Sequence, residues 1–278
     1  FTEWPINIEL LSRTQSPKKR ETIINDLRLG QTDIVIGTHA VLSEKISYPT
    51  LGLIIVDEEH RFGVRDKEKL KKIRYGVDYL AMTATPIPRT LNMAIGELKD
   101  ISMIATPPES RLPIKTYISR WEKNLIKEAF QREINRGGQI LFVHNKINDI
   151  ENISEQLRSI FPDLSIEIAH GQMRERKLEQ IMMRFYNNEF SVLLATTIIE
   201  SGLDIPNANT IIINNAQNFG LSDLHQMRGR VGRSNKKAFC FLITPPRISM
   251  SEEGRKRIQA LEQHSDLGAG FNIAMRDL

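Results

Sequence analysis

The sequence lacks the features that would assign it to several common classes of protein. It holds a single cysteine in 278 residues, so a fold stapled by internal disulfides is excluded. Its apolar runs have the length of a strand, well short of the roughly 20 residues that a membrane helix needs. Cys240 lies inside the apolar run 238–243, which predicts a buried, inert thiol. These features favour a cytoplasmic protein without membrane contact.

A phosphate-binding loop is missing as well. The sequence contains no Gly-Lys pair, so the pattern G-x-x-x-x-G-K-[ST] does not occur. The lysine and hydroxyl of that loop hold a nucleotide phosphate and its Mg²⁺. We therefore expect ATP to bind poorly to this chain by itself.

Charge is nearly balanced over the whole chain but not along it. The net charge of +4 says little about partners, whereas residues 225–260 hold nine basic residues and only two acidic ones. Such a segment is typical of proteins that bind a polyanion. A second basic cluster at 65–74 has helical spacing and fits a solvated helix face.

Apolar runs alternate with helical patterns in two blocks, which predicts an α/β fold with parallel sheets. The segment 106–113 separates the blocks, because it has three prolines and no periodicity. We expect strands at 33–37, 51–57, 79–83, 114–118, 139–143, 165–169, 191–196, 210–213 and 237–243. We expect helices at 17–29 (with Ser16 as its cap), 67–74, 122–135, 149–160, 175–186 and 221–229, with another beginning near Arg89.

The most informative stretch runs from Leu51 to Val64. The run 53–56 predicts a parallel strand buried on both faces, and it ends in Asp57, Glu58, Glu59 and His60. Ligands bind at the carboxyl edge of such sheets. An apolar strand that ends in Asp-Glu is the Walker B pattern, in which Asp57 holds Mg²⁺ and Glu58 polarises an attacking water. A polar strand end before a helix cap is the alternative.

A second chemical signal is the segment 226–233, QMRGRVGR. Arg228, Arg230 and Arg233 are separated by glycines, which let the backbone bring cations close to a phosphate. Arginine beside a transferring phosphoryl group stabilises the charge of the transition state. A basic helix terminus favoured by the helix dipole is the alternative.

Taken in order, the motifs resemble those of the superfamily 2 helicases over almost the whole chain. They are GTH (37–39), DEEH (57–60), TAT (83–85), TT (196–197), GLDIP (202–206) and QMRGRVGR (226–233). Within that superfamily, five longer segments are similar to the translocase core of the bacterial transcription-repair coupling factors: DEEHRFGVRDKEKLK, LAMTATPIPRTLNMA, ATPPESRLPIKT, TTIIESGLDIPNANTIII and FGLSDLHQMRGRVGRS. The RecG fork-remodelling helicases are the related alternative, for which we expect DEQH instead of DEEH.

The resemblance implies two RecA-like parallel-sheet lobes, the first incomplete, at 1–105 and 114–246. A linker would occupy 106–113, and 247–278 would begin the helical hairpin of a translocation motif. ATP and Mg²⁺ would be used between the lobes. The missing phosphate loop then suggests a fragment cut after the opening β-α units of the first lobe.

The resemblance also implies a role for individual residues. Asp57 would coordinate Mg²⁺, Glu58 would activate the hydrolytic water, and Arg230 and Arg233 would be arginine fingers. Other residues would serve the nucleotide (Gly202, Asp204), couple the nucleotide site to DNA (His60, Thr83, Thr85, Gln226) or contact the DNA backbone (Thr38, His39, Arg89, Asn145, His170, Gln172, Arg174, Thr196). Gln226 would also belong to the catalytic set.

The implied function is translocation on double-stranded DNA, independent of base sequence and without strand separation. In that family the motor pushes a stalled RNA polymerase, and contacts with the polymerase and a nucleotide-excision repair protein would be made by regions absent from this chain. Two alternatives stay open: a RecG-type fork or junction helicase, and a DNA-binding remnant without enzymatic activity.

Overall fold

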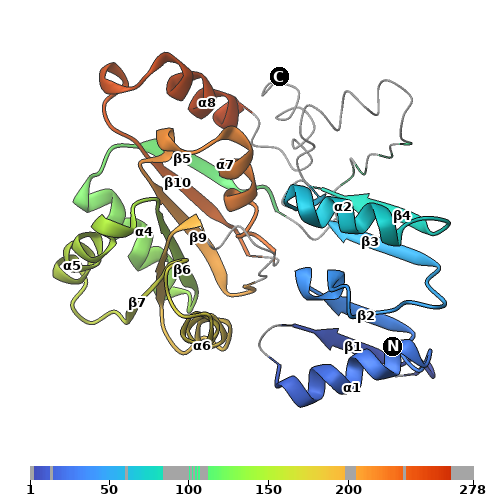
Figure 1. Cartoon of the computed structure of the whole chain (residues 1–278). Helices are drawn as coiled ribbons and strands as arrows, with labels where there is room; N and C mark the ends of the chain where they lie inside the picture. The colour runs from blue at the N-terminus through green and yellow to red at the C-terminus, as the bar shows by residue number, and fades with distance from the viewer. Residues whose placement is uncertain are drawn as a thin grey trace. The chain divides into compact units, whose positions relative to one another are not determined.

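The computed structural model describes residues 3–12, 15–59, 62–83, 112–197, 205–233 and 236–263, together with 100, 102, 104 and 106. Its contacts divide the chain into two units, Phe1–Ala84 and Thr85–Leu278. Both units contain parallel strands and helices (Figure 1). The limits predicted for the linker at 106–113 and for a separate region from 247 onward stay predictions.

The first unit contains two pairs of parallel strands. β1 (Ile8–Leu11) pairs with β2 (Ile34–Gly37), and β3 (Leu53–Asp57) pairs with β4 (Asp78–Met82). The first helix, α1 (Pro17–Arg28), begins as predicted, because Ser16 Oγ accepts a hydrogen bond of 3.3 Å from the Lys19 amide. A short 3-10 helix, η1 (His39–Leu42), follows β2, and α2 (Val64–Ile73) follows β3. The second helix therefore begins three residues earlier than the sequence predicted.

Only one face of each strand pair is covered within the described part of this unit. Val56 packs against Leu70 of α2, whereas Leu53 and Ile55 are 52% and 56% exposed. The prediction that 53–56 is buried on both faces is therefore wrong for the structure described. Successive strand side chains point to opposite faces, and only the face of Val56 meets a helix.

The second unit is built on a sheet of six parallel strands in the order β5-β10-β9-β6-β8-β7 (Figure 1). The strands are β5 (Lys115–Ser119), β6 (Gln139–His144), β7 (Ile166–Ala169), β8 (Val192–Ala195), β9 (Ala208–Asn214) and β10 (Phe239–Ile243). The helices are α4 (Lys123–Asn135), α5 (Ile150–Ile160), α6 (Glu175–Tyr186), α7 (Leu221–Arg228) and α8 (Glu252–Gln263), with 3-10 turns η3 (Ile147–Asp149), η5 (Ala216–Asn218) and η6 (Arg247–Ser249). The predicted strands and helices of this unit are confirmed to within two residues at most ends.

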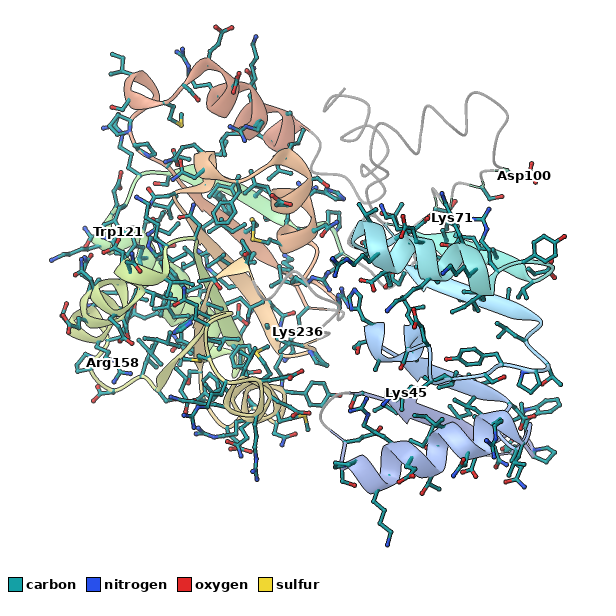
Figure 2. The ribbon with its side chains drawn as sticks, in the orientation of Figure 1. Lys45, Lys71, Asp100, Trp121, Arg158 and Lys236 are labelled. Atoms are coloured by element: carbon teal, nitrogen blue, oxygen red, sulfur yellow. The ribbon has the colours of Figure 1, made fainter. Side chains whose placement is uncertain are left out.

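Helices cover both faces of this sheet. On one face, α4 and α5 pack against alternate side chains such as Phe142 and Ile212. Trp121 and Arg158, which Figure 2 labels, belong to this layer, and the Arg158 guanidinium donates to the Ile166 carbonyl at 2.8 Å. The parallel strands are therefore buried between two layers, as their continuous apolar runs predict.

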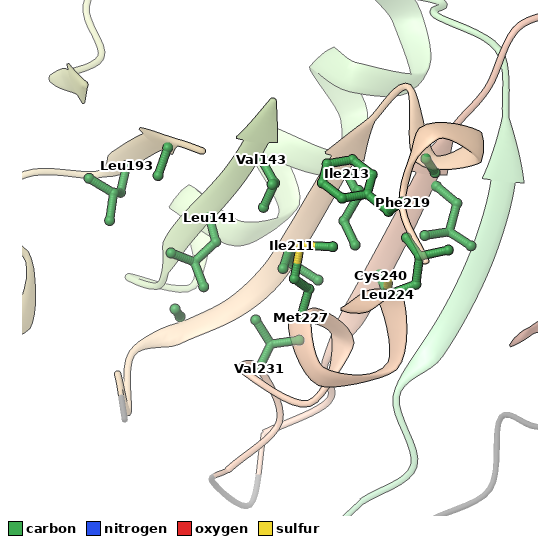
Figure 3. Packing of buried hydrophobic residues seen from close by; sticks show 14 of the residues in the cluster. Leu141, Val143, Leu193, Ile211, Ile213, Phe219, Leu224, Met227, Val231 and Cys240 are labelled. Carbon is green, nitrogen blue, oxygen red and sulfur yellow. The ribbon is translucent and has the colours of Figure 1, made fainter. Parts of the chain in front are cut away.

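The other face packs against α6, α7 and α8. Figure 3 shows Leu141, Ile211 and Met227 meeting in this layer. Cys240 lies in the same cluster, and burial raises the pKa of its thiol to about 12. The prediction of a buried thiol is confirmed.

No helix within the described ranges is both long and apolar enough to cross a membrane. Among the described helices of the second unit, the longest is α4, which has 13 residues. It carries charged residues along its length, including a basic residue, Arg132, in its last turn. This pattern is that of a helix with one face toward a protein core and one toward water.

Candidate nucleotide and nucleic-acid sites

Asp57 and Glu58 lie at the carboxyl end of β3, as predicted. Glu58 adopts a left-handed backbone conformation with φ +50°, and its amide donates to the Met82 carbonyl at 2.9 Å. This turn brings the Glu58 side chain beside β4, where Oε2 accepts a hydrogen bond of 2.7 Å from the Thr83 hydroxyl. Left-handed conformations of residues other than glycine cost free energy and cluster at functional sites.

The next carboxylate, Glu59, takes a different role. The pKa of Tyr79 is raised to about 12, mainly by burial and further by the nearby charge of Glu59, to which its hydroxyl bonds. The Arg74 guanidinium lies over the Tyr79 ring, 5.1 Å from its centroid. Glu59 therefore helps to anchor this turn to α2 and β4, whereas Glu58 faces the Thr83 side.

Thr38 and His39 begin η1 at the carboxyl end of β2. The close approach of the chain at Gly37 requires glycine, because a Cβ atom there would lie 2.4 Å from the Leu11 carbonyl oxygen. His39 Nε2 lies 3.6 Å from Asp66 Oδ2, and the His39 ring contacts the Phe62 ring at 4.9 Å between centroids. The predicted DNA-contacting loop thus packs on the segment that follows Asp57 and Glu58.

The arginine segment of the second unit divides into buried and accessible side chains. Gln226 and Arg228 on α7 are 6% and 3% exposed, whereas Arg233 is exposed and Arg230 is partly exposed. Arg228 donates to the Leu261 carbonyl of α8 at 3.2 Å and lies 3.1 Å from His225 Nδ1. Arg228 is thus a structural link between two helices, and the expectation that all three arginines approach a phosphate is corrected for it.

The turn that carries Arg230 and Arg233 depends on Gly232. Its φ is +74°, and a Cβ atom there would lie 3.0 Å from Ala238 Cβ and 3.1 Å from Ile114 Cγ1. A side chain would meet both the conformational penalty and a tight contact. Gly232 is therefore favoured by its backbone conformation and by packing, independently of any phosphate.

A row of polar side chains crosses the carboxyl edge of the second sheet. His144 at the end of β6 stands in register with Asn214 at the end of β9. Thr196 and His170 directly follow β8 and β7, whose last residues are paired with each other. The fully buried His144 accepts or donates at Nδ1 to the Asn214 amide at 3.1 Å.

The remaining predicted DNA contacts surround this row. Asn145 follows His144 and is partly buried, and Gln172 and Arg174 are exposed just before α6. Thr196 is 7% exposed. The structure thus brings the second-unit candidates to one edge of one sheet. His60, Thr85, Arg89, Gly202 and Asp204 lie outside the described residues.

Sequence reasoning missed several polar residues of these sites: Asp66, Asp149, His144 and Asn214. His144 and Asn214 had a usable signal, because each follows an uninterrupted apolar run, as Asp57 does. Asp66 and Asp149 had no such signal, since charged residues in the first turn of a helix are common.

The donor set at β3 fits a magnesium ion. Asp57 is exposed, and no side-chain hydrogen bond or ion pair engages it within the described part of the chain. Carboxylate oxygens are the ligands that Mg²⁺ prefers. No group of three or more His, Cys, Asp or Glu in the described ranges is arranged to hold a metal.

Comparison with known proteins places the chain in a family. Residues 1–94 match the DEAD/DEAH box helicase model, and 122–235 match the helicase conserved C-terminal domain. The chain is 50% identical over all 278 residues to the transcription-repair-coupling factor of Escherichia coli K12. It is 49% identical over 276 residues (99% of the chain) to that of Staphylococcus aureus USA300. It spans 24% of the length of each of these relatives.

A solved structure of RecG bound to a three-way DNA junction matches with a TM-score of 0.77 and 35% identity. The match covers 100% of this chain and 36% of RecG. Both domain models are helicase models, and the chain is a member of the superfamily 2 helicases, with lobes of the RecA-like kind. The relatives that share about half of its residues are transcription-repair-coupling factors, which confirms the resemblance seen in the motif segments.

Proposed function

We propose that this chain is the motor of an ATP-dependent double-stranded DNA translocase of transcription-coupled repair that displaces stalled RNA polymerase. The observation that carries the proposal is the turn at Glu58, whose left-handed backbone aims the carboxylate at Thr83. The likeness to the coupling factors supports the biological setting. The polymerase and a nucleotide-excision repair protein would be bound through regions outside this chain.

The chemistry is ATP hydrolysis shared by the two units. ATP bound with Mg²⁺ supplies the phosphoryl group whose transfer to water drives movement. Asp57 would hold the ion and Glu58 would polarise the water, while Arg230 and Arg233 would stabilise negative charge on the phosphoryl oxygens. Gly202 and Asp204 would be further residues that bind the nucleotide.

The DNA would be held through its phosphates and sugars. Thr38 and His39 of the first unit would serve, together with Arg89. A further set would serve in the second unit: Asn145, His170, Gln172, Arg174 and Thr196. Contacts of this kind carry no base information, so binding is independent of sequence and weakens as salt rises. The coupling between nucleotide state and DNA binding would involve His60, Thr83, Thr85 and Gln226.

The test is steady-state ATP hydrolysis with and without duplex DNA. Because the sequence has no Gly-Lys pair, the 278-residue chain is compared with a version that carries a G-x-x-x-x-G-K-[ST] segment ahead of residue 1. Turnover stimulated by duplex DNA in the longer version supports the proposal. Binding of DNA without turnover in either version would favour the non-enzymatic alternative.

A second candidate function is remodelling of DNA forks or junctions, favoured by the likeness to RecG over the whole chain. A motor of the first kind releases RNA polymerase stalled on duplex DNA, whereas one of the second kind regresses a model fork. Comparing the two reactions in the longest available form of the protein separates them. Activity on forks alone would replace the first proposal by the second.

A further inference from the structure

His144 ends β6, and the connections between strands of the second sheet run in opposite directions from β6 and from its neighbour β9. The strands that follow β6, namely β7 and β8, lie on one side of it, whereas β10, which follows β9, lies on the other side. β6 and β9 are neighbours, and α5 and α7, the helices that follow them, pack on opposite faces. Ligands of open α/β sheets bind in the crevice beyond the carboxyl ends at such a point.

Two partners surround the His144 imidazole. Nδ1 lies 3.1 Å from the Asn214 amide nitrogen, and Nε2 lies 3.4 Å from Asp149 Oδ2. Asp149 precedes α5, and its other carboxylate oxygen accepts from the Asn152 amide at 3.2 Å. Asn214, His144 and Asp149 thus join the ends of two strands to the beginning of a helix.

The protonation state follows from these partners. An amide N–H of Asn214 that donates to Nδ1 requires a lone pair there, so the proton of the neutral ring lies on Nε2, facing the Asp149 carboxylate. Burial lowers the pKa of His144, and Lys146 acts in the same direction, while Asp149 opposes both. The neutral ring with its proton on Nε2 is therefore the form at neutral pH.

The segment between His144 and Asp149 contains Asn145, one of the proposed contacts to the DNA backbone. Residues 145–148 span from His144 to Asp149, and Asn145 is the first of them. At this corner, His144 Nε2 and Asn145 Oδ1 are buried polar atoms without a well-aligned hydrogen bond to any described residue. Buried polar groups left in this way are costly, so their placement indicates a site that a ligand or water completes.

We propose that His144 is a positioning residue: bonded to Asn214 and directed toward Asp149, it fixes the segment 145–148 so that Asn145 meets the DNA backbone. This inference rests on the proposed DNA contact of Asn145. His144 itself is fully buried and acts through its neighbour.

The decisive experiment asks whether Asp149 acts on DNA binding by holding His144 in place or only through its negative charge. Asp149→Ala removes one negative charge close to the DNA, which by itself would tighten binding of a polyanion. If Asp149 instead holds His144 and the segment, the same variant weakens duplex binding, by about three- to tenfold for the loss of one well-placed contact. Glu151→Ala is the matched control, because it removes an exposed carboxylate two residues further along α5.

Binding is measured by fluorescence anisotropy of a labelled duplex with the 278-residue chain at pH 7.5. The inference requires weaker binding by Asp149→Ala and equal or tighter binding by Glu151→Ala. Tighter binding by both variants would overturn it. Absence of duplex binding by the unaltered chain would overturn the proposed DNA interface itself, so the two failures are distinguishable.

Substitution at the imidazole gives an independent comparison. His144→Leu should weaken duplex binding to a similar degree without changing the salt dependence, because the contact it disturbs is uncharged. Gln139→Met is its control: Gln139 is fully buried at the opposite end of β6 and donates to the Phe185 and Phe190 carbonyls. Equal losses of affinity in both variants would attribute the effect to general destabilisation and overturn the inference.

The tautomer is directly observable. Nitrogen NMR of the His144 ring at neutral pH should show a lone-pair nitrogen at Nδ1 and a protonated nitrogen at Nε2. The opposite tautomer would place a lone pair toward the Asp149 carboxylate and would contradict the proposed link.

Discussion

The Thr83 hydroxyl donates a 2.7 Å hydrogen bond to Oε2 of Glu58, which joins residues that are 25 positions apart in the sequence. Thr83 directly follows β4, and Glu58 directly follows β3. Because these strands are parallel and paired, their following residues meet at the same edge of the sheet. The first threonine of the TAT segment thus bonds to the first glutamate of the DEEH segment.

Glu58→Gln should abolish ATP turnover in the version that carries a phosphate loop. The amide keeps the size of the side chain but cannot polarise water, and loss of such a group costs about 10²- to 10⁴-fold in rate. ATP and duplex binding should persist, as measured with a fluorescent nucleotide and by anisotropy. Glu59→Gln is the control, since Glu59 bonds to Tyr79; undiminished hydrolysis by Glu58→Gln would refute the assignment.

Thr83→Val should lower turnover in that same version by about tenfold. The variant keeps the shape of the side chain but removes the donor that orients Glu58, and one hydrogen bond to a charged group is worth about 1.5 kcal/mol or more. Thr83→Ser retains the hydroxyl and should recover most of the rate. Equal rates for the valine and serine variants would show that the bond does not contribute.

Gly232→Ala should destabilise the second unit by about 1–3 kcal/mol. An alanine would adopt the unfavourable φ of +74°, and its methyl group would meet tight contacts at 3.0 and 3.1 Å. Gly171→Ala serves as control, because no atom lies within 4 Å of its added Cβ and its φ is not positive. Urea denaturation followed by circular dichroism measures both, and a Gly232→Ala protein as stable as the control would contradict the packing described.

Arg228→Lys should loosen α8 from α7. Lysine cannot reach both the Leu261 carbonyl and His225, so a loss of about 1–3 kcal/mol in the free energy of unfolding is expected. Hydrogen exchange should rise in α8. Arg255→Lys, at an exposed position of α8, should change neither the free energy of unfolding nor the hydrogen exchange of α8.

The stability of the second unit should fall as the pH drops below about 6.5, the ordinary pKa of histidine. Burial lowers the pKa of His144 in the folded state, so the unfolded chain takes up a proton first and is favoured as the pH falls. The loss grows with a limiting slope of about 1.36 kcal/mol per pH unit and ends below the lowered pKa.

His144→Gln should remove this part of the pH dependence, since glutamine does not titrate. The rest of the chain is the same in both proteins, so the difference between the two curves isolates His144. Parallel curves between pH 7.5 and 5 would mean that His144 is not held neutral.

Much of the fold was predictable because it follows from local patterns. The run that ends at Asp57, the cap at Ser16 and the alternation of the second unit each depend on a few adjacent residues. The exposure of Leu53 and Ile55 was not predictable, because burial depends on which helix reaches which face. Arg228 was also misjudged, since its partner at Leu261 lies 33 residues away.

The sequence by itself determined the class of the protein: its motifs and their order, the strand ends that carry Asp57 and Glu58, and the glycines around Arg230. Only the tertiary structure decided which of these groups meet. Glu58 reaches Thr83, and His144 reaches Asn214 across 70 residues, because the order and register of strands bring distant chain segments to one edge. Register is set by packing of the whole sheet, which no short pattern records.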